Sequence, residues 1–165
     1  YDAGVCQEVL ATPLKKVFNR LGLGKLIYLF IALKQLIFIS PGKLSVTLDN
    51  EKTFSYDHVY FTAVMNQKYE GGGFKFCPEA RPDDRILDVI LVEGVSKIKL
   101  LFCLPTAFFG KHVGIRGIHI FTCGDIHVHS EAPLPIHIDG ESGGIRKDLT
   151  VSVEKSSLKI LLPVI

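Results

Sequence analysis

The spacing of apolar positions changes near residue 43. From there on, apolar residues recur at every second position, as in Leu44, Val46 and Leu48, and this period of two predicts a half-buried strand. Asp49–Lys52 is a turn, and Thr53–Tyr56 is expected to return as the second strand of a hairpin. Further strands are predicted at short intervals, over residues 58–66, 86–92, 117–122, 125–130, 134–138, 149–153 and 158–162.

The most apolar segment, Lys25–Ile39, precedes the strands. It ends at Ser40-Pro41-Gly42, a sequence typical of the end of a helix. About 20 apolar residues are needed to cross a bilayer, whereas this segment is shorter and contains Lys34 and Gln35. We therefore expect a helix packed on the core. The alternative is that part of its apolar surface contacts a lipid substrate or a membrane.

Two shorter helices complete the predicted elements. One runs from Thr12-Pro13 to Arg20, and the other begins at Ser96, is interrupted near Pro105 and ends at Phe109. Short strands separated by Gly, Asp and Pro predict a mainly β fold, an antiparallel β-sandwich with two or three helices. The connections are too short for the helical crossovers of a parallel sheet, and no linker is visible, so residues 1–165 are predicted to form one domain.

Composition narrows the class of protein. Hydrophobic residues make up 47% and charged residues 22%, as in ordinary globular proteins. A net charge of +2, without a cluster of Lys and Arg among aromatic residues, gives no reason to expect a nucleic-acid partner. The four cysteines form no Cys-x-x-Cys pair and are expected to be reduced thiols in a cytoplasmic protein. No signal peptide is visible, and because the first residue is Tyr, we expect a fragment of a longer protein.

The loop from Gly71 to Asp88 is the first candidate site. It begins with three glycines, contains two prolines and carries Asp83 and Asp84 just before a predicted strand. Backbone carbonyls beside a carboxylate suit a hard cation such as Mg²⁺ or Ca²⁺. The alternative is a solvated turn, because Gly, Pro and Asp are the ordinary turn residues.

Asp139-Gly140-Glu141 is the second candidate site. Gly140 can bend the backbone and direct both carboxylates at one centre. One carboxylate near a metal ion and one that accepts a proton are what phosphoryl transfer needs. From spacing alone, however, Asp-Gly-Glu is more often an ordinary hairpin turn.

Metal-binding side chains also gather in one part of the chain; they are Cys123, His127, His129, His137 and Asp139. If the strands that carry them are neighbours, three histidines and a carboxylate could bind zinc or another transition metal. The alternative is that His127 and His129 face solvent while Ile126 and Val128 face the core.

Three motifs occur in a fixed order: Asn66-x-x-x-x-Gly71-Gly72-Gly73, then Cys77-Pro78-x-Ala80-x-Pro82-Asp83-Asp84-x-x-Leu87-Asp88, then Asp139-Gly140-Glu141. This order resembles the C-terminal half of the diacylglycerol kinase/sphingosine kinase superfamily, above all the bacterial soluble lipid kinases. The opening Tyr1–Val5 is also similar to the segment that follows the first domain in that family. The resemblance spans nearly the whole chain.

The resemblance implies a two-domain enzyme with its active site in the cleft between the domains. An N-terminal α/β domain carries a Gly-Gly-Asp-Gly-Thr-type nucleotide loop, and a C-terminal β-sandwich carries the lipid-side and metal-side residues. This chain has no such nucleotide loop, so it is expected to be the C-terminal domain alone, inactive without its kinase domain in cis. ATP, a lipid substrate and a transient membrane surface are the implied partners.

By the same resemblance, Glu141 is the catalytic base. It would accept the proton of the lipid hydroxyl as that oxygen attacks the γ-phosphate of ATP. Asp139 would be its partner at the nucleotide and Mg²⁺, and Gly140 completes the cofactor-binding motif.

The loop that contains Asp83 and Asp84 is similar to the structural Mg²⁺ site of the family. There the side chain of Asp84 and the backbone carbonyls of Arg81 and Ile86 would bind the ion. The family usually has Gly after the second Asp, whereas this chain has Arg85. If that position needs a positive φ, Arg85 is strained or the loop differs.

Two functions follow as expectations. The first is the C-terminal domain of an ATP-dependent lipid kinase that acts on a diacylglycerol-like lipid, located in the cytoplasm or peripherally at the membrane. The alternative is a non-catalytic β-sandwich that binds a lipid or another small ligand. An exposed sheet edge would also allow a homodimer.

Overall fold

The computed structural model describes residues 40–70 and 73–154. These residues form six strands and one helix: β1 (Gly42–Leu48), β2 (Lys52–Met65), β3 (Leu87–Glu93), α4 (Lys97–Phe108), β4 (Ile118–Cys123), β5 (Asp125–Ile138) and β6 (Glu141–Ser152). The strands are hydrogen-bonded in the order β4-β3-β2-β1-β5-β6, and every neighbouring pair is antiparallel. The helices predicted at 12–20 and 25–39 and the strand predicted at 158–162 lie outside the described residues.

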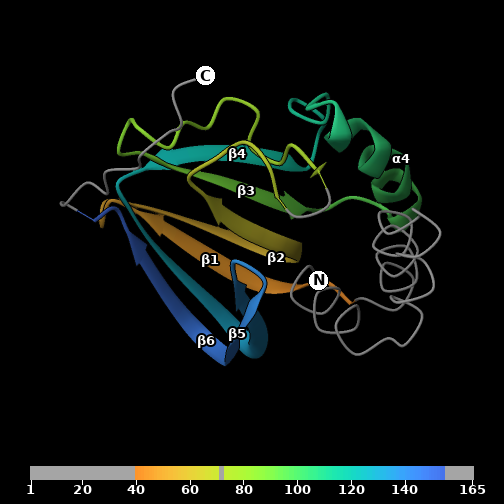
Figure 1. Ribbon diagram of the computed structural model, residues 1–165. Helices are drawn as coiled ribbons and strands as arrows, with labels where there is room; N and C mark the ends of the chain where they lie inside the picture. Colours follow the sequence, from red (N-terminus) through yellow and green to blue (C-terminus); the bar gives the residue numbers. More distant parts are fainter. Residues whose placement is uncertain (1–39, 71–72, 155–165) are drawn as a thin grey trace, which may run out of the picture.

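The sheet folds over along β2, so that β1, β5 and β6 form one layer and β3 and β4 the other (Figure 1). The predicted mainly β, sandwich-like fold is therefore confirmed. The first half of β2 pairs with β1 and the second half with β3, and the register shifts between Val59 and Phe61. This irregularity lets one strand belong to both layers.

Two segments that the sequence pattern divides are continuous in the structure. Thr53–Tyr56 and residues 58–66 were predicted as separate strands, but both belong to β2; residues 125–130 and 134–138 both belong to β5. In β5 the register with β6 shifts between His129 and Leu134. The partner strand continues across this irregularity, so the strand bends without ending.

Strand β3 is buried on both faces. Leu87, Val89 and Leu91 join the cluster between the layers, which we call the inner core. The inner core also contains Leu44, Val46, Leu48, Val59, Cys123, Ile126 and Val128. Ile90 and Val92 face the other way, into a second cluster, the outer core. Burial on both sides explains why β3 reads as a continuous apolar run instead of an alternating one.

The outer core lies where α4 and the segment after the glycine loop cover β3. It contains Tyr60, Met65, Phe74, Phe76, Cys77, Ala80, Val95, Leu100 and Ala107 in addition to the β3 residues. Phe74 stacks on Phe108, with ring centroids 4.1 Å apart, and so holds the loop against the end of α4. Lys75 N also donates to Ala107 O at 2.9 Å.

Helix α4 begins where predicted, because the Ser96 hydroxyl accepts a hydrogen bond from Lys99 N at 3.2 Å and caps the first turn. The predicted interruption near Pro105 is wrong, since the helix continues to Phe108. Pro105 cannot donate to Leu101 O, but both residues are exposed, so water can bond to that carbonyl. Among the described residues, no helix is long and apolar enough to span a bilayer.

Candidate functional site

Asp139 and Gly140 form a two-residue turn between β5 and β6. Ile138 pairs with Glu141 across the turn, and φ is 49° at Asp139 and 87° at Gly140. Positive φ at both central positions is the pattern of a type I′ turn, for which Asp-Gly is a preferred sequence. The hairpin interpretation of this sequence is therefore confirmed, and the turn fixes the backbone that carries the two carboxylates.

The carboxylates of Asp139 and Glu141 are exposed to solvent. Among the described residues, neither forms a hydrogen bond or an ion pair with another side chain. The hairpin around them carries two strongly exposed apolar side chains, Ile138 and Ile145. Both carboxylates are thus available to an incoming ligand, because no cationic side chain of the described residues is paired with them.

The loop before β3 is organised by its own aspartates. Asp84 Oδ1 accepts a hydrogen bond from Ile86 N at 3.0 Å. Arg85, which lies between them, has φ of 61°. An aspartate that bonds to the backbone two residues ahead is a common way to close a turn. The position after the second aspartate therefore does need a positive φ, and Arg85 is in a strained conformation.

Asp83 differs from Asp84 in its partner. Arg81 Nε donates to Asp83 Oδ1 at 3.2 Å, and Arg81 Nη2 donates to Asp83 Oδ2 at 3.3 Å. This two-point contact lowers the pKa of the Asp83 carboxyl and raises the pKa of Arg81. Both oxygens of Asp83 are consequently paired with Arg81, whereas one oxygen of Asp84 has no donor among the residues that the structure describes.

The donor atoms of this loop suit a hard divalent cation. The side chain of Asp84 and the carbonyls of Arg81 and Ile86 are all oxygen ligands, which Mg²⁺ prefers. Asp88 lies four residues further on, is only 5% exposed, and has its pKa raised by burial and by the negative charge of Asp84. A cation bound at Asp84 would relieve this repulsion, so the residues present fit such an ion.

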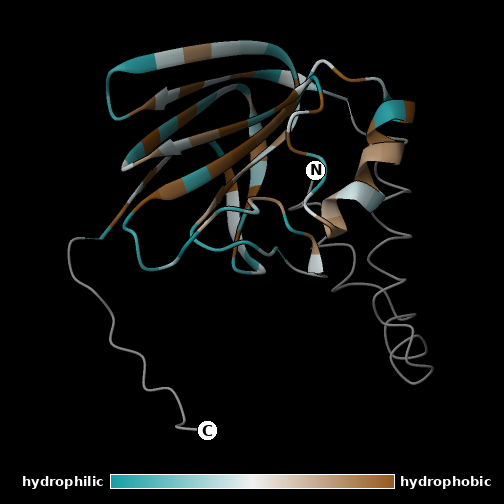
Figure 2. Cartoon of the chain, turned by 90° about the horizontal axis from the view of Figure 1, so that it is seen from above, coloured by the Kyte–Doolittle hydropathy of each residue, from teal (hydrophilic) through white to brown (hydrophobic). Residues whose placement is uncertain are grey.

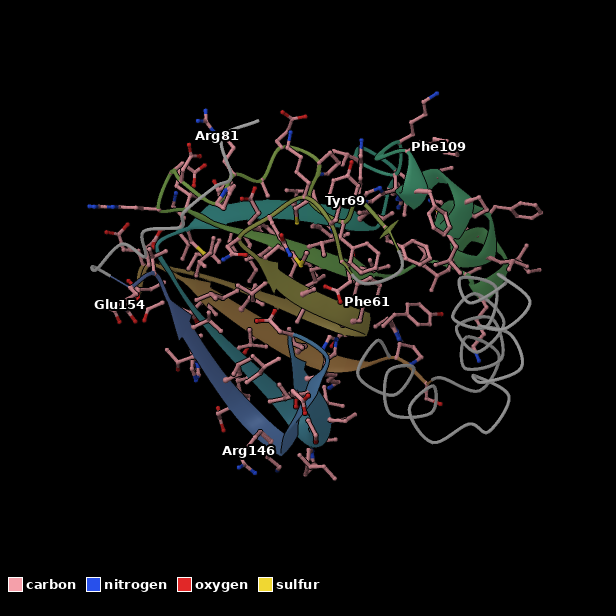
Figure 3. All side chains as sticks on the ribbon, in the orientation of Figure 1. Phe61, Tyr69, Arg81, Phe109, Arg146 and Glu154 are labelled. Carbon is pink, nitrogen blue, oxygen red and sulfur yellow. The ribbon has the colours of Figure 1, made fainter. Side chains whose placement is uncertain are left out.

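Figure 3 places Arg81 at the end of the upper layer, well apart from Arg146 on β6. Leu87, just after the aspartate loop, pairs with Cys123 next to the start of β5, whereas the Asp139-Gly140 turn follows the other end of that 14-residue strand. The structure therefore does not bring the two candidate loops together within this domain. Each would have to act at its own part of the surface.

The transition-metal alternative is wrong for the described residues, which contain all five of its side chains. Among them, no group of three or more His, Cys, Asp or Glu side chains is placed to hold a metal ion. Ile126 and Val128 are buried in the inner core, so His127 and His129 lie on the outward face, as the second interpretation expected.

The outward-facing histidines share an aspartate that sequence reasoning missed. His129 Nδ1 lies 2.7 Å from Asp148 Oδ1, and His127 Nε2 lies 3.5 Å from the same oxygen. The hydrogen bond from His129 lowers the pKa of Asp148. Asp148 lies directly opposite His129 on β6, a neighbour that only the strand register reveals.

The chain is similar to known proteins in both sequence and structure. A family model described as "YegS C-terminal NAD kinase beta sandwich-like domain" matches residues 6–162. The chain is 33% identical over 144 residues to "Putative lipid kinase YtlR" of Bacillus subtilis, a match that covers 87% of this chain and 46% of that protein. It is 27% identical over 141 residues to a diacylglycerol kinase of Mycobacterium tuberculosis, covering 85% of this chain and 44% of the relative.

Among solved structures, a "putative diacylglycerol kinase from Bacillus anthracis str. Sterne" matches with a TM-score of 0.56. Its sequence identity is 20%, and the match covers 73% of this chain and 40% of that chain. At this sequence identity, the structural similarity shows a shared fold and nothing further. The chain spans about half the length of the curated relatives that it matches.

Proposed function

The chain belongs to the YegS-like family of lipid and diacylglycerol kinases, as a C-terminal NAD kinase-like β-sandwich domain, and on this premise we propose that it supplies the catalytic base of an ATP-dependent lipid kinase. The reaction would transfer the γ-phosphate of ATP to the hydroxyl of a diacylglycerol-like lipid. An N-terminal nucleotide-binding domain in cis would complete the active site, so the domain alone would be inactive.

The observation that carries this proposal is the Asp139-Gly140 turn with its exposed carboxylates. Glu141 acts as the general base: it accepts the proton of the lipid hydroxyl while that oxygen forms its bond to the γ-phosphorus and ADP leaves. Asp139 would contact the nucleotide and its Mg²⁺. The type I′ turn holds both residues on a backbone of one conformation, which favours positioning, the main demand of phosphoryl transfer.

A second, structural Mg²⁺ is proposed in the loop before β3. The side chain of Asp84 and the carbonyls of Arg81 and Ile86 would hold it. When bound, the ion would neutralise the Asp84 charge beside buried Asp88 and tie the loop to β3. Arg81, through its contact with Asp83, keeps the neighbouring carboxylate out of this site.

The proposal is tested by ATP-dependent phosphorylation of a panel of lipids dispersed in detergent micelles. The intact protein is compared with Glu141→Gln and with the matched control Glu51→Gln, which changes another exposed glutamate at a hairpin. Glu141→Gln should lower kcat by about 10²- to 10⁴-fold, the usual contribution of a general base, while the control keeps full activity.

The outcomes separate the alternatives. Turnover of one lipid that collapses only in Glu141→Gln supports the kinase and its base. Turnover that survives Glu141→Gln keeps the kinase and rejects this base. If no lipid is phosphorylated although ATP binds the folded protein, the non-catalytic lipid-binding module is favoured. The strained conformation of Arg85 would then support no catalytic site.

A further inference from the structure

The outward face of α4 and the turn after it expose large apolar side chains. Ile98 is 70% exposed, Phe102 73% and Phe109 72%, while Leu100, Cys103 and Ala107 point to the core. Ile98 and Phe102 are four residues apart and therefore lie on one face of the helix. Figure 2 shows α4 at the margin of the molecule in predominantly hydrophobic colours, and Figure 3 shows Phe109 at its end.

The same part of the chain is free of acidic residues. From Gly94 to Gly124 there is no Asp or Glu, although the whole chain has 17 of them. The basic residues of this segment are Lys97, Lys99, Lys111 and Arg116. Three of them are exposed, and only Lys99 is partly buried. Within this segment, the exposed apolar side chains are therefore accompanied by positive charge alone.

One hydrogen bond joins the two parts of this face. Lys99 Nζ donates to Arg116 O at 2.7 Å and so connects the first turns of α4 to the loop that leads into β4. Val113, which is 49% exposed, lies in that connecting segment. We call the combined face the α4 surface; it consists of Ile98, Phe102, Phe109 and Val113 with Lys97, Lys111 and Arg116.

Charge complementarity selects the occupant of the α4 surface. A second copy of the chain, paired through the same face, would bring lysine against lysine. The apolar segment Lys25–Ile39 contains Lys25 and Lys34 and no acidic residue, so it offers no complementary charge either. An anionic bilayer offers both an apolar interior and negatively charged headgroups.

We propose that the α4 surface docks the protein on anionic membranes, with Ile98, Phe102 and Phe109 inserted between the headgroups and the lysines at the lipid phosphates. The inference rests on exposure and charge and not on the proposed catalysis. Vesicle binding is therefore measured without ATP, and its failure would leave the micelle-based kinase assay untouched.

The test is flotation of the intact protein with vesicles of phosphatidylcholine, with and without phosphatidylglycerol. The apolar variant is Ile98→Ser/Phe102→Ser, and the charge variant is Lys97→Glu/Lys111→Glu. The control, Leu134→Ser/Ile145→Ser, changes two exposed apolar residues of the β5–β6 hairpin. Circular dichroism checks that each protein is folded.

The wild type should bind phosphatidylglycerol vesicles and bind pure phosphatidylcholine weakly, with less binding at high salt. Each α4 variant should bind about tenfold less, since headgroup attraction and apolar insertion contribute together, while the control binds as the wild type does. Two independent variants keep the test decisive if one of them folds poorly.

Three results would overturn the proposal. The first is equal binding of wild type and both α4 variants. The second is vesicle binding that survives in the α4 variants and is lost in Leu29→Asp/Leu33→Asp, which would move the membrane contact to Lys25–Ile39. The third is a wild-type dimer, by light scattering, that Ile98→Ser/Phe102→Ser converts to a monomer, which would make the α4 surface an interface between copies.

Discussion

Arg85 holds its backbone at φ of 61°, a left-handed conformation that L side chains rarely adopt. The hydrogen bond from Ile86 N to Asp84 Oδ1 closes the turn around it. For a residue with a Cβ this conformation costs about 1–2 kcal/mol. The turn thus needs a backbone conformation that glycine adopts without strain. Arg85, whose side chain is exposed, adopts it at a cost in stability.

Replacing Arg85 with Gly should therefore stabilise the protein. We expect the free energy of unfolding to rise by about 0.5–1 kcal/mol, because relief of the left-handed strain exceeds the extra chain entropy of glycine. Urea unfolding followed by circular dichroism measures it. Arg146→Gly, at an exposed strand position of β6 without positive φ, is the control and should lose stability. A loss of similar size in Arg85→Gly would contradict the strain.

Asp84 and Asp83 form a matched pair for the proposed Mg²⁺ site. Within the described part of the chain, one oxygen of Asp84 has no hydrogen-bond donor, whereas both oxygens of Asp83 contact Arg81. Millimolar Mg²⁺ should raise Tm of the wild type and of Asp83→Asn, because an ion that binds only the folded state stabilises it. Asp84→Asn should lose this shift. An equal shift in all three proteins would place the ion elsewhere or make its effect nonspecific.

At the scale of elements, the connection from α4 to β4 depends on how closely two backbones approach. Glu93 N donates to Gly117 O at 2.8 Å, and Gly117 has φ of 92°. A Cβ at Gly117 would overlap the backbone oxygen of Glu93 and the Val95 side chain. Gly114 has a similar φ of 85°, but a Cβ there would meet nothing within 4 Å.

These two glycines separate backbone strain from steric overlap. Gly114→Ala should cost about 1 kcal/mol of unfolding free energy, from the left-handed conformation alone. Gly117→Ala should cost at least about 2 kcal/mol more, since β3 and β4 must also move apart to admit the methyl group. Thermal unfolding of both variants measures the difference. Equal losses would mean that the connection yields without strain.

The sequence predicted β1, β3 and the start of α4 well, because local signals fix them: alternation at Leu44, Val46 and Leu48, an apolar run, and the Ser96 cap. It divided β2 because β3, the partner strand past the register shift, is remote in the chain. It divided β5 because residues 131–135, around the register shift with β6, are all exposed, so the apolar alternation stops there. The Asp139-Gly140 turn could also be predicted, because its two residues alone indicate the turn type. The contact of Asp148 could not be predicted, because its position opposite His129 depends on strand register.

At the scale of the whole molecule, the two cores lie on opposite faces of β3, and each core contains a buried thiol. Cys77 belongs to the outer core and Cys123 to the inner core. Burial raises the pKa of Cys77 to about 12 and that of Cys123 to about 11. Both thiols are free of disulfides, as is buried Cys103, as expected for these three cysteines, whereas Cys6 lies outside the described residues.

Stability should therefore fall in alkali. An unfolded thiol ionises near 9.0, whereas these folded pKa values are higher, so the folded state holds its protons more tightly. The contribution is fully present below pH 9 and is lost as pH rises from there toward 11 and 12. Each thiol adds up to about 1.4 kcal/mol per pH unit to the slope.

Urea unfolding at a series of pH values from 8 upward measures this slope. Cys77→Ala and Cys123→Ala should each flatten it, whatever they do to stability at pH 8. Cys103→Ala is the nearest control, because burial raises its thiol pKa without a comparably large shift. A slope that both variants leave unchanged would show that other groups, such as Tyr56, dominate the alkaline loss.

The strand order also determines when each strand of a nascent chain can pair with its neighbours. Strand β1 lies between β2 and β5, and Asp49, at its end, accepts hydrogen bonds from Gly124 and Asp125, the latter 76 positions later. At about 5–20 residues per second, a ribosome needs roughly 4–15 s to deliver that partner. Until then one edge of β1 has no partner strand. Either the short length of β1 or a chaperone must keep this edge from pairing with other nascent chains on the same polysome.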